Sequence, residues 1–337
     1  MTEFTQLPRK ERAAVFEETA ARVGIGRAAI VEKDFWVCWT LEHLFGPDGP
    51  ADVTQPAQSL VFKGGTSLSK VYGLIDRFSE DVDLTVNRTL IIDRSADPEE
   101  TGLTNRERKR RIKAMELACT RYVAQSMLPF LKSLDVGAVG IDNDPATLEF
   151  HYPRALADAA YGGGAYVNAS IRLEFGARGD LQPSESGLVS SYAAQEFPDA
   201  FSARAIPVLA LSPRRTFWEK ATILHAISSH GKTTALARQS RHYSDLARIA
   251  ASPIGDAALR DTSMLQAVTR HKNRFFASGG ARYDLAVPGT LRLLPSAALQ
   301  TELGKDYARM REMFIAEPPP FDQVMADIKA LQDFINS

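Results

Sequence analysis

The feature that most constrains this chain is the stretch "FKGGTSLSKVYGLIDRFSEDVDLTV", residues 62–86. A short apolar run, "SLVF", leads into a Gly-Gly pair, and a helix-like segment separates that pair from "DVDLTV". Short apolar and β-branched runs of this kind predict buried strands, whereas apolar positions at helical spacing predict a helix. The stretch therefore predicts a strand, a Gly-Gly turn, a helix and a second strand that carries Asp-x-Asp.

The two aspartates of this second strand, Asp81 and Asp83, are predicted to share a face. Side chains alternate along a strand, so Thr85 joins them while the residues between them point to the core. Same-face residues lie about 6.6 to 6.8 Å apart, close enough for both carboxylates to share divalent cations, which prefer oxygen ligands. A solvated acidic strand face is an equally good interpretation of so short a pattern. The apolar residues in between are Val82, Leu84 and Val86.

The glycines suggest a phosphate site. Gly64 and Gly65 allow a tight turn and a close backbone approach, and Thr66 or Ser67 is expected to cap the following helix and leave its N–H groups for an anion. "GGTSLSK" does not satisfy the Walker pattern, which disfavours a P-loop ATPase. A Gly-Gly turn by itself is more often structural than functional, so the argument rests on its combination with Asp-x-Asp.

The rest of the chain predicts an α+β protein of two domains. Its 337 residues exceed the usual single-domain length. Helices are expected over residues 9–45, 66–75 and about 104–134, and an alternating strand near 166–175. From about residue 206 the signals are mainly helical. We therefore predict a mixed domain over residues 1–205 and a helical domain over 206–337.

Composition excludes several classes of protein. The 40 basic and 41 acidic side chains nearly cancel, so nucleic-acid binding would need a local patch. No run reaches the roughly 18 apolar residues of a membrane helix, and the N-terminus lacks an apolar signal-peptide stretch, so a cytoplasmic protein without membrane contact is expected. Cys38 and Cys119 are far apart and predict core residues, neither a disulfide nor a zinc site.

Three further residues are candidate site residues, and the sequence around each of them also allows a structural interpretation. Lys220 falls in the apolar sector of a predicted helix, so it either snorkels from the helix end or points into an internal polar site. Glu174 stands on the polar face of "ASIRLEF" as a candidate third acid, or equally as a partner for Arg172. Asp245 lies at helical spacing from Arg241 and Arg248, which by itself predicts ordinary surface ion pairs.

A basic run, "NRERKRRIKAMELA", is a local patch that could bind nucleic acid. Such runs are usually solvated helix faces, although this density of charge could also bind an RNA backbone. Its six cations are Arg106, Arg108, Lys109, Arg110, Arg111 and Lys113.

The order of elements around the Gly-Gly pair and Asp-x-Asp resembles the DNA-polymerase-β-like nucleotidyltransferase core. With "VEKDFW", "FWEKATILHA", "HYSDLARI" and "YDLAVPGTLRLLP", nearly the whole chain resembles the AbiEii/AbiGii-type (MenT-like) nucleotidyltransferase toxins. The resemblance implies an antitoxin partner, a nucleoside triphosphate substrate and transfer to the 3′ end of tRNA. It also implies that Lys220 contacts the triphosphate and that Asp245 belongs to the active site, and it matches Ser79 to a serine that can be modified when the toxin is silenced.

These features together predict a nucleotidyltransferase that uses Mg²⁺, with Mn²⁺ as an alternative ion, bound by Asp81 and Asp83. The acceptor is predicted to be RNA, and a small-molecule or protein hydroxyl is the alternative acceptor. A non-catalytic nucleotide- or partner-binding module is the alternative from a different class. The predicted catalytic residues are Asp81, Asp83, Glu174, Lys220 and Asp245. The predicted nucleotide-binding residues are Lys63, Gly64, Gly65, Thr66, Ser67, Ser79 and Arg241.

Overall fold

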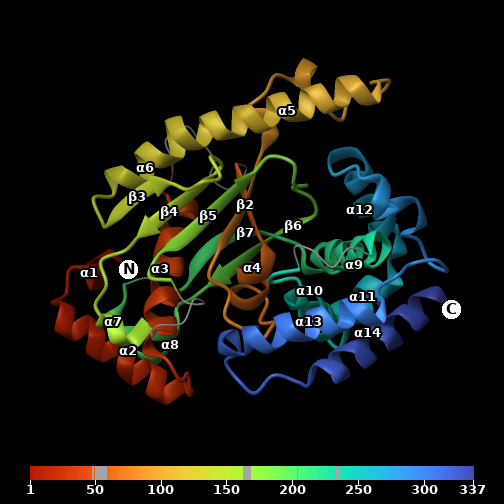
Figure 1. Cartoon of the computed structure of the whole chain (residues 1–337). Coiled ribbons are helices and arrows are strands. Elements are labelled where there is room, and N and C mark those ends of the chain that lie inside the picture. Colours follow the sequence, from red (N-terminus) through yellow and green to blue (C-terminus); the bar gives the residue numbers. More distant parts are fainter. Residues whose placement is uncertain (48, 50–58, 162–167, 203, 232–235) are drawn as a thin grey trace. The chain divides into compact units, whose positions relative to one another are not determined.

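The structure is a computed structural model, and the chain divides into two compact units (Figure 1). The N-terminal unit comprises Met1–Tyr72 and Phe78–Leu211, and the C-terminal unit comprises Gly73–Arg77 and Ser212–Ser337. The predicted domain boundary after residue 205 stays a prediction. The structure describes residues 1–47, 49, 59–161, 168–202, 204–231 and 236–337.

A mixed sheet organises the N-terminal unit. The part of the chain that the structure describes forms seven strands in the order β3-β4-β5-β2-β1-β7-β6. The pairs β2–β5 and β1–β7 are parallel and the other pairs are antiparallel. A mixed sheet combined with many helices confirms the predicted α+β class. The strands are β1 Leu60–Lys63, β2 Val82–Val86, β3 Ala138–Ile141, β4 Thr147–His151, β5 Ile171–Gly176, β6 Ser184–Val189 and β7 Ile206–Leu211.

Helix α3 (Ala28–Phe45) lies in this unit's core, and its side chains are buried on nearly every side. It packs against β5 and β7, and its Trp36 stacks on Tyr152 while its Phe35 contacts Phe4. The predicted helices in residues 9–45 and 104–134 are confirmed. The other helices are α1 Thr2–Thr5, α2 Arg9–Val23, α4 Gly64–Lys70, α5 Asn105–Tyr122, α6 Leu128–Ser133, α7 Asp158–Tyr161 and α8 Tyr192–Glu196, with a π-helical turn Val123–Met127 joining α5 to α6.

Two predicted elements have different bounds. The helix expected over 66–75 begins at Gly64 and ends at Lys70, because the chain turns at Gly73, whose φ of 59° a right-handed helix cannot accommodate. The strand expected near 166–175 is β5, which begins at Ile171, and residues 166–167 lie outside the described part of the chain.

The C-terminal unit is helical. Helix α9 packs against α10, α11 and α12, and Pro213 at its first turn and Gly231 with φ 62° after its last turn define its ends. The segment Gly73–Arg77 joins this unit through a β-bridge from Arg77 to Phe314. The helices are α9 Pro213–His230, α10 Ser240–Ala250, α11 Pro253–Arg260, α12 Thr262–Phe275, α13 Ala297–Arg309 and α14 Phe321–Asn336. Among all described residues, no helix is long and apolar enough to cross a membrane.

Candidate active site

The aspartates lie on and just before β2, near the middle of the sheet. Asp83 is opposite Lys63 of antiparallel β1 on one side and opposite Glu174 of parallel β5 on the other. Asp81 precedes the strand by one residue and, like Asp83, is half-buried. Sheet pairing therefore brings together three acids that the sequence presents from two distant segments.

The predicted division of β2 into two faces is observed, with one addition. Val82, Leu84 and Val86 are buried in the core, as expected. Thr85, on the face of the aspartates, is also buried, and a Cβ at Gly179 would approach its Oγ1 to 2.3 Å. The acidic face is thus open near Asp81 and Asp83 and covered further along the strand, which argues against an ordinary solvated strand.

Gly64 brings the backbone of α4 against the Asp83 carboxylate. Its φ is 80°, and a Cβ built on it would lie only 1.9 Å from Asp83 Oδ2. Glycine is therefore required here both for the left-handed backbone and for the close approach. The turn therefore places the Asp83 carboxylate next to the backbone at the start of α4, where the sequence predicts a phosphate-binding site.

The prediction that Thr66 or Ser67 caps α4 is wrong. The residue before the helix is Lys63, and its side chain makes no capping hydrogen bond. The Thr66 hydroxyl donates to the carbonyl oxygen of Asp81, and the Ser67 hydroxyl donates to the carbonyl oxygen of Gly64. Both hydroxyls are used to hold the turn against the strand, a tertiary contact that local capping rules do not include.

Burial, together with the neighbouring Asp83 and Asp81, raises the pKa of Glu174 above its ordinary value, against the opposing effect of Arg172 and Lys63. Arg172 Nη1 lies 3.4 Å from Glu174 Oε1, so the predicted pairing with Arg172 also occurs, along the same strand. Glu174 therefore lies opposite Asp83 and also pairs with Arg172, and its role as a third acid stays a prediction. Repulsion among three acids is the condition that a bound cation relieves.

The residues present fit a magnesium site that the substrate completes. Among the residues described, no three His, Cys, Asp or Glu side chains form a ready-made metal cluster. Mg²⁺, however, is usually bound by one or two carboxylates together with waters and substrate phosphates. Asp81 and Asp83 supply such a pair, and the close backbone of Gly64 leaves the carboxylate of Asp83 directed at the turn.

A second polar group is built inside the C-terminal unit around Asp245. Arg77 Nε and Nη2 donate to its two oxygens, each at 2.8 Å, and Lys220 Nζ donates to Oδ2 at 2.8 Å. All three side chains are buried. The expectation of surface ion pairs for Asp245 is therefore wrong, because helical spacing cannot reveal a partner from another segment. Lys220 points into an internal polar site, as one of its two interpretations proposed.

This group carries more positive than negative charge. Burial would raise the pKa of Asp245, but Arg77 and Lys220 outweigh burial and hold that pKa well below its ordinary value. Burial lowers the pKa of Lys220, and Arg77 and Arg241 lower it further against the effect of Asp245. The pKa of His242 is lowered by burial and then by Lys220 and Arg241. Arg77 and Lys220 thus form two ion pairs with a single carboxylate.

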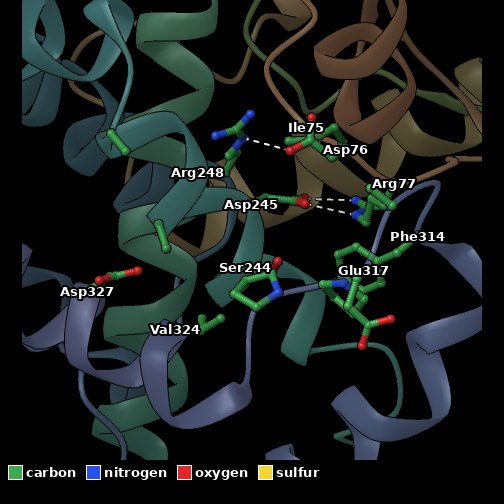
Figure 2. Close-up of a pocket in the computed structure, with 15 residues that line it drawn as sticks. Ile75, Asp76, Arg77, Ser244, Asp245, Arg248, Phe314, Glu317, Val324 and Asp327 are labelled. Carbon is green, nitrogen blue, oxygen red and sulfur yellow. Dashed lines mark hydrogen bonds and ion pairs between the residues drawn. The ribbon is translucent and has the colours of Figure 1, made fainter.

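Figure 2 shows the cavity beside this group, about 400 Å³ in volume, with the Arg77–Asp245 pair at its wall. Arg248 Nε lies 2.9 Å from Asp76 Oδ2, so Arg248 pairs with Asp76 and not with Asp245. Sequence reasoning missed Arg77. In the sequence, Arg77 is marked only by its position four residues before Asp81. No helix or strand periodicity links it to Asp245.

The remaining predicted side chains, Ser79, Lys63 and Arg241, are all half-buried. Ser79 is half-buried in the irregular segment before Asp81, and Lys63 is the half-buried last residue of β1. Arg241 is half-buried in the first turn of α10. The acids belong to the N-terminal unit, whereas Lys220, Arg241 and Asp245 belong to the C-terminal unit.

With this geometry established, the comparisons with known proteins decide the family. A family model described as "Nucleotidyl transferase AbiEii toxin, Type IV TA system" matches residues 51–327. The chain belongs to this family. It is a nucleotidyltransferase toxin of a type IV toxin-antitoxin system, which implies a nucleoside triphosphate substrate, a divalent metal ion and an antitoxin partner. The family assignment favours an enzyme over the alternative of a non-catalytic module.

A solved structure, the nucleotidyltransferase toxin MenT4 from Mycobacterium tuberculosis H37Rv, is similar over 96% of this chain and 99% of its own. Its sequence identity is 15% and the TM-score is 0.44. No curated protein sequence matches the chain.

Proposed function

We propose that this AbiEii-type enzyme binds Mg²⁺ through Asp81 and Asp83 and transfers a nucleoside monophosphate from a triphosphate to RNA, at the 3′ end of a tRNA. The observation that carries the proposal is the position of Asp83, between Lys63 and Glu174 in the sheet and against the backbone of Gly64. The predicted Mn²⁺ remains an alternative ion for the same oxygen ligands. A triphosphate and RNA are cytoplasmic substrates, in line with the predicted location.

Each residue has a defined role in the proposed reaction. The bound ion would bind triphosphate oxygens and stabilise the charge that develops on the entering and leaving oxygens. Glu174, whose pKa is raised, accepts the proton of the attacking hydroxyl. That oxygen bonds to the α-phosphorus, the bond from the α-phosphorus to its bridging oxygen breaks, and pyrophosphate leaves. Lys63 and the backbone N–H groups of the turn bind phosphate oxygens.

The C-terminal unit is proposed to bind the leaving group. The motif resemblance assigns Lys220 to the triphosphate, and the positive charge in excess at Asp245 supports this role with Arg241 as a second donor. Asp245 orients Lys220 through the 2.8 Å hydrogen bond. We further propose that Ser79, only two residues before Asp81, borders the nucleotide, so that a modification there would obstruct it.

The proposed RNA surface is one face of α5. Arg106, Lys109 and Lys113 follow one another at spacings of three and four residues, which places them on the same side of the helix, and all three are exposed. By contrast, Arg110 and Arg111 form ion pairs with Glu107. Arg108 Nε donates to the carbonyl oxygen of Pro98. We call Arg106, Lys109 and Lys113 the basic stripe; it is narrower than the run of six that the sequence suggested.

The nature of the acceptor is tested by incubating the enzyme with each labelled triphosphate, Mg²⁺ and total cellular RNA. Label is expected in an RNA of tRNA size, and it should disappear in an Asp83→Asn variant. Label in a small molecule or a protein would overturn the RNA proposal and support the alternative acceptor. Transfer that persists in Asp81→Asn and Asp83→Asn would overturn the metal assignment.

The basic stripe is tested by changing its three residues to Gln. Each lost phosphate contact should reduce the log-log salt slope of RNA binding by roughly 0.7 to 0.9 units, so a loss of about two units is expected. The matched control, Arg110→Gln with Arg111→Gln, removes charges already paired with glutamates and should change the slope less. Equal slopes in the two variants would contradict the assignment. Triphosphate binding should be unchanged in both.

A further inference from the structure

Two adjacent buried charges in α3, Lys33 and Asp34, have partners on both sides of the candidate active site. They are exposed by only 2% and 1%, values that are unusual for lysine and aspartate unless each is paired. All their contacts described below lie within the N-terminal unit. Neither residue belongs to the predicted substrate site, so the burial of two charges in the core needs another explanation.

Lys33 contacts the chain immediately before the first aspartate. Its Nζ donates to Glu80 Oε2 at 2.7 Å and to the carbonyl oxygen of Asn168 at 2.9 Å. Glu80 is itself buried, and it directly precedes Asp81. The pair therefore fixes the peptide from which the Asp81 side chain extends.

Asp34 contacts the C-terminal end of α4, the helix that begins with the Gly-Gly pair. Its Oδ1 lies 2.6 Å from Nζ of Lys70, the last residue of α4, and its Oδ2 accepts a hydrogen bond of 2.8 Å from the backbone N–H of Tyr192. The Lys70 ammonium also lies over the Tyr192 ring, 4.1 Å from its centroid. Asp34 therefore fixes the end of α4, whose first residue is Gly64.

These two contacts and the Thr66 hydrogen bond to Asp81 form a closed connection. It runs from α3 through Lys70 and α4 to Asp81, and back through Glu80 to α3. Buried ion pairs contribute little net stability, but each demands one geometry because a misplaced partner leaves a charge unpaired in the core. The arrangement suits a site in which the Asp83 carboxylate must lie against Gly64 to within a fraction of an ångström.

We propose that Lys33 and Asp34 are positioning residues of the nucleotidyltransferase, which hold the Asp81 segment and α4 in the geometry needed for metal and triphosphate. The proposal rests on the function proposed above for Asp81 and Asp83. It assigns the two residues no contact with substrate. Their effect is exerted through Glu80 and Lys70.

The test neutralises both members of a pair, because removing one member leaves a buried charge and can unfold the protein. One variant is Lys33→Met with Glu80→Gln, and the other is Asp34→Asn with Lys70→Met. The matched control is Glu32→Gln. Glu32 is the preceding residue of α3 and equally buried, but it accepts hydrogen bonds from the backbone of Ala155 and Leu156.

Two readouts are measured on the full chain. In amide hydrogen exchange without ligands, the pair variants should exchange faster at residues 64–67 and 79–83, whereas Glu32→Gln should exchange faster near 155–161. Mg²⁺-dependent binding of a non-hydrolysable triphosphate should weaken about tenfold or more in the pair variants and remain near wild type in the control, since loss of the groups that orient a metal ligand typically costs about 10- to 100-fold in metal affinity.

The outcomes separate this inference from the proposed function. Wild-type protein that does not bind triphosphate with Mg²⁺ would overturn the proposed function, while the exchange data would still report on the contacts. Wild-type binding that is lost in Asp83→Asn but unchanged in both pair variants would overturn the positioning role. Pair variants that match Glu32→Gln in exchange at 79–83 would overturn it as well.

Discussion

Replacing Gly64 by Ala should disable the site at a moderate cost in stability. The residue would have to adopt a φ of 80°, which costs an L-residue roughly 1 to 2 kcal/mol. Its Cβ would lie 1.9 Å from Asp83 Oδ2, while contacts under 3.0 Å are essentially never observed. The carboxylate must therefore retreat by about 1.1 Å, far beyond the roughly 0.2 Å tolerance of a metal–ligand distance.

We expect Gly64→Ala to weaken Mg²⁺-dependent triphosphate binding by about tenfold to a hundredfold, the usual cost of disturbing the orientation of a metal ligand. Calorimetric titration with a non-hydrolysable triphosphate measures this effect, and thermal unfolding measures the stability. Gly24→Ala is the matched control, because Gly24 ends α2 with a φ of 70° and a Cβ added to it would meet no atom within 4 Å. Both variants should lose stability through the positive φ, and Gly64→Ala should lose more because only its Cβ would meet another side chain. If Gly64→Ala binds triphosphate as tightly as Gly24→Ala does, the close approach of Gly64 to the Asp83 carboxylate does not matter for binding, and the reasoning is refuted.

Three other predictions follow from the charges. Asp245→Asn should lower the free energy of unfolding by about 3 to 5 kcal/mol in denaturant titration, because it leaves Arg77 and Lys220 buried without their carboxylate; an unchanged midpoint would contradict this network. Lys220→Met should lose transfer while remaining folded, since Arg77 still pairs with Asp245; normal transfer would exclude it from the site. Because the pKa of Glu174 is raised, the folded protein binds the extra proton, and Glu174 favours folding less as pH rises through that pKa. Glu174→Gln should therefore be more stable than wild type near neutral pH, as measured by unfolding. It should also transfer about 10²- to 10⁴-fold more slowly, without the loss of rate at acidic pH that protonation of Glu174 causes in wild type; an unchanged pH profile would exclude Glu174 as the base.

The local alternation of "DVDLTV" was sufficient to predict β2 and its two faces, because the period of a strand is set by backbone geometry alone. The same sequence stretch with its glycines, and the motifs that accompany it, indicated the family that the comparisons confirmed. Lys220 in an apolar helix sector correctly signalled an internal polar site, since a charge there must be paired.

The partners of these residues required the tertiary structure. Asp245 had two arginines at helical spacing, yet it pairs with Arg77, 168 residues away in sequence. Thr66 was expected to cap α4, yet its hydroxyl reaches Asp81. Local rules count only the partners that a helix or strand brings near, whereas a buried charge is satisfied by whichever segment packs against it. The sequence alone indicated the family and the side chains that we propose carry the chemistry, and only packing of distant segments decided what each of them contacts.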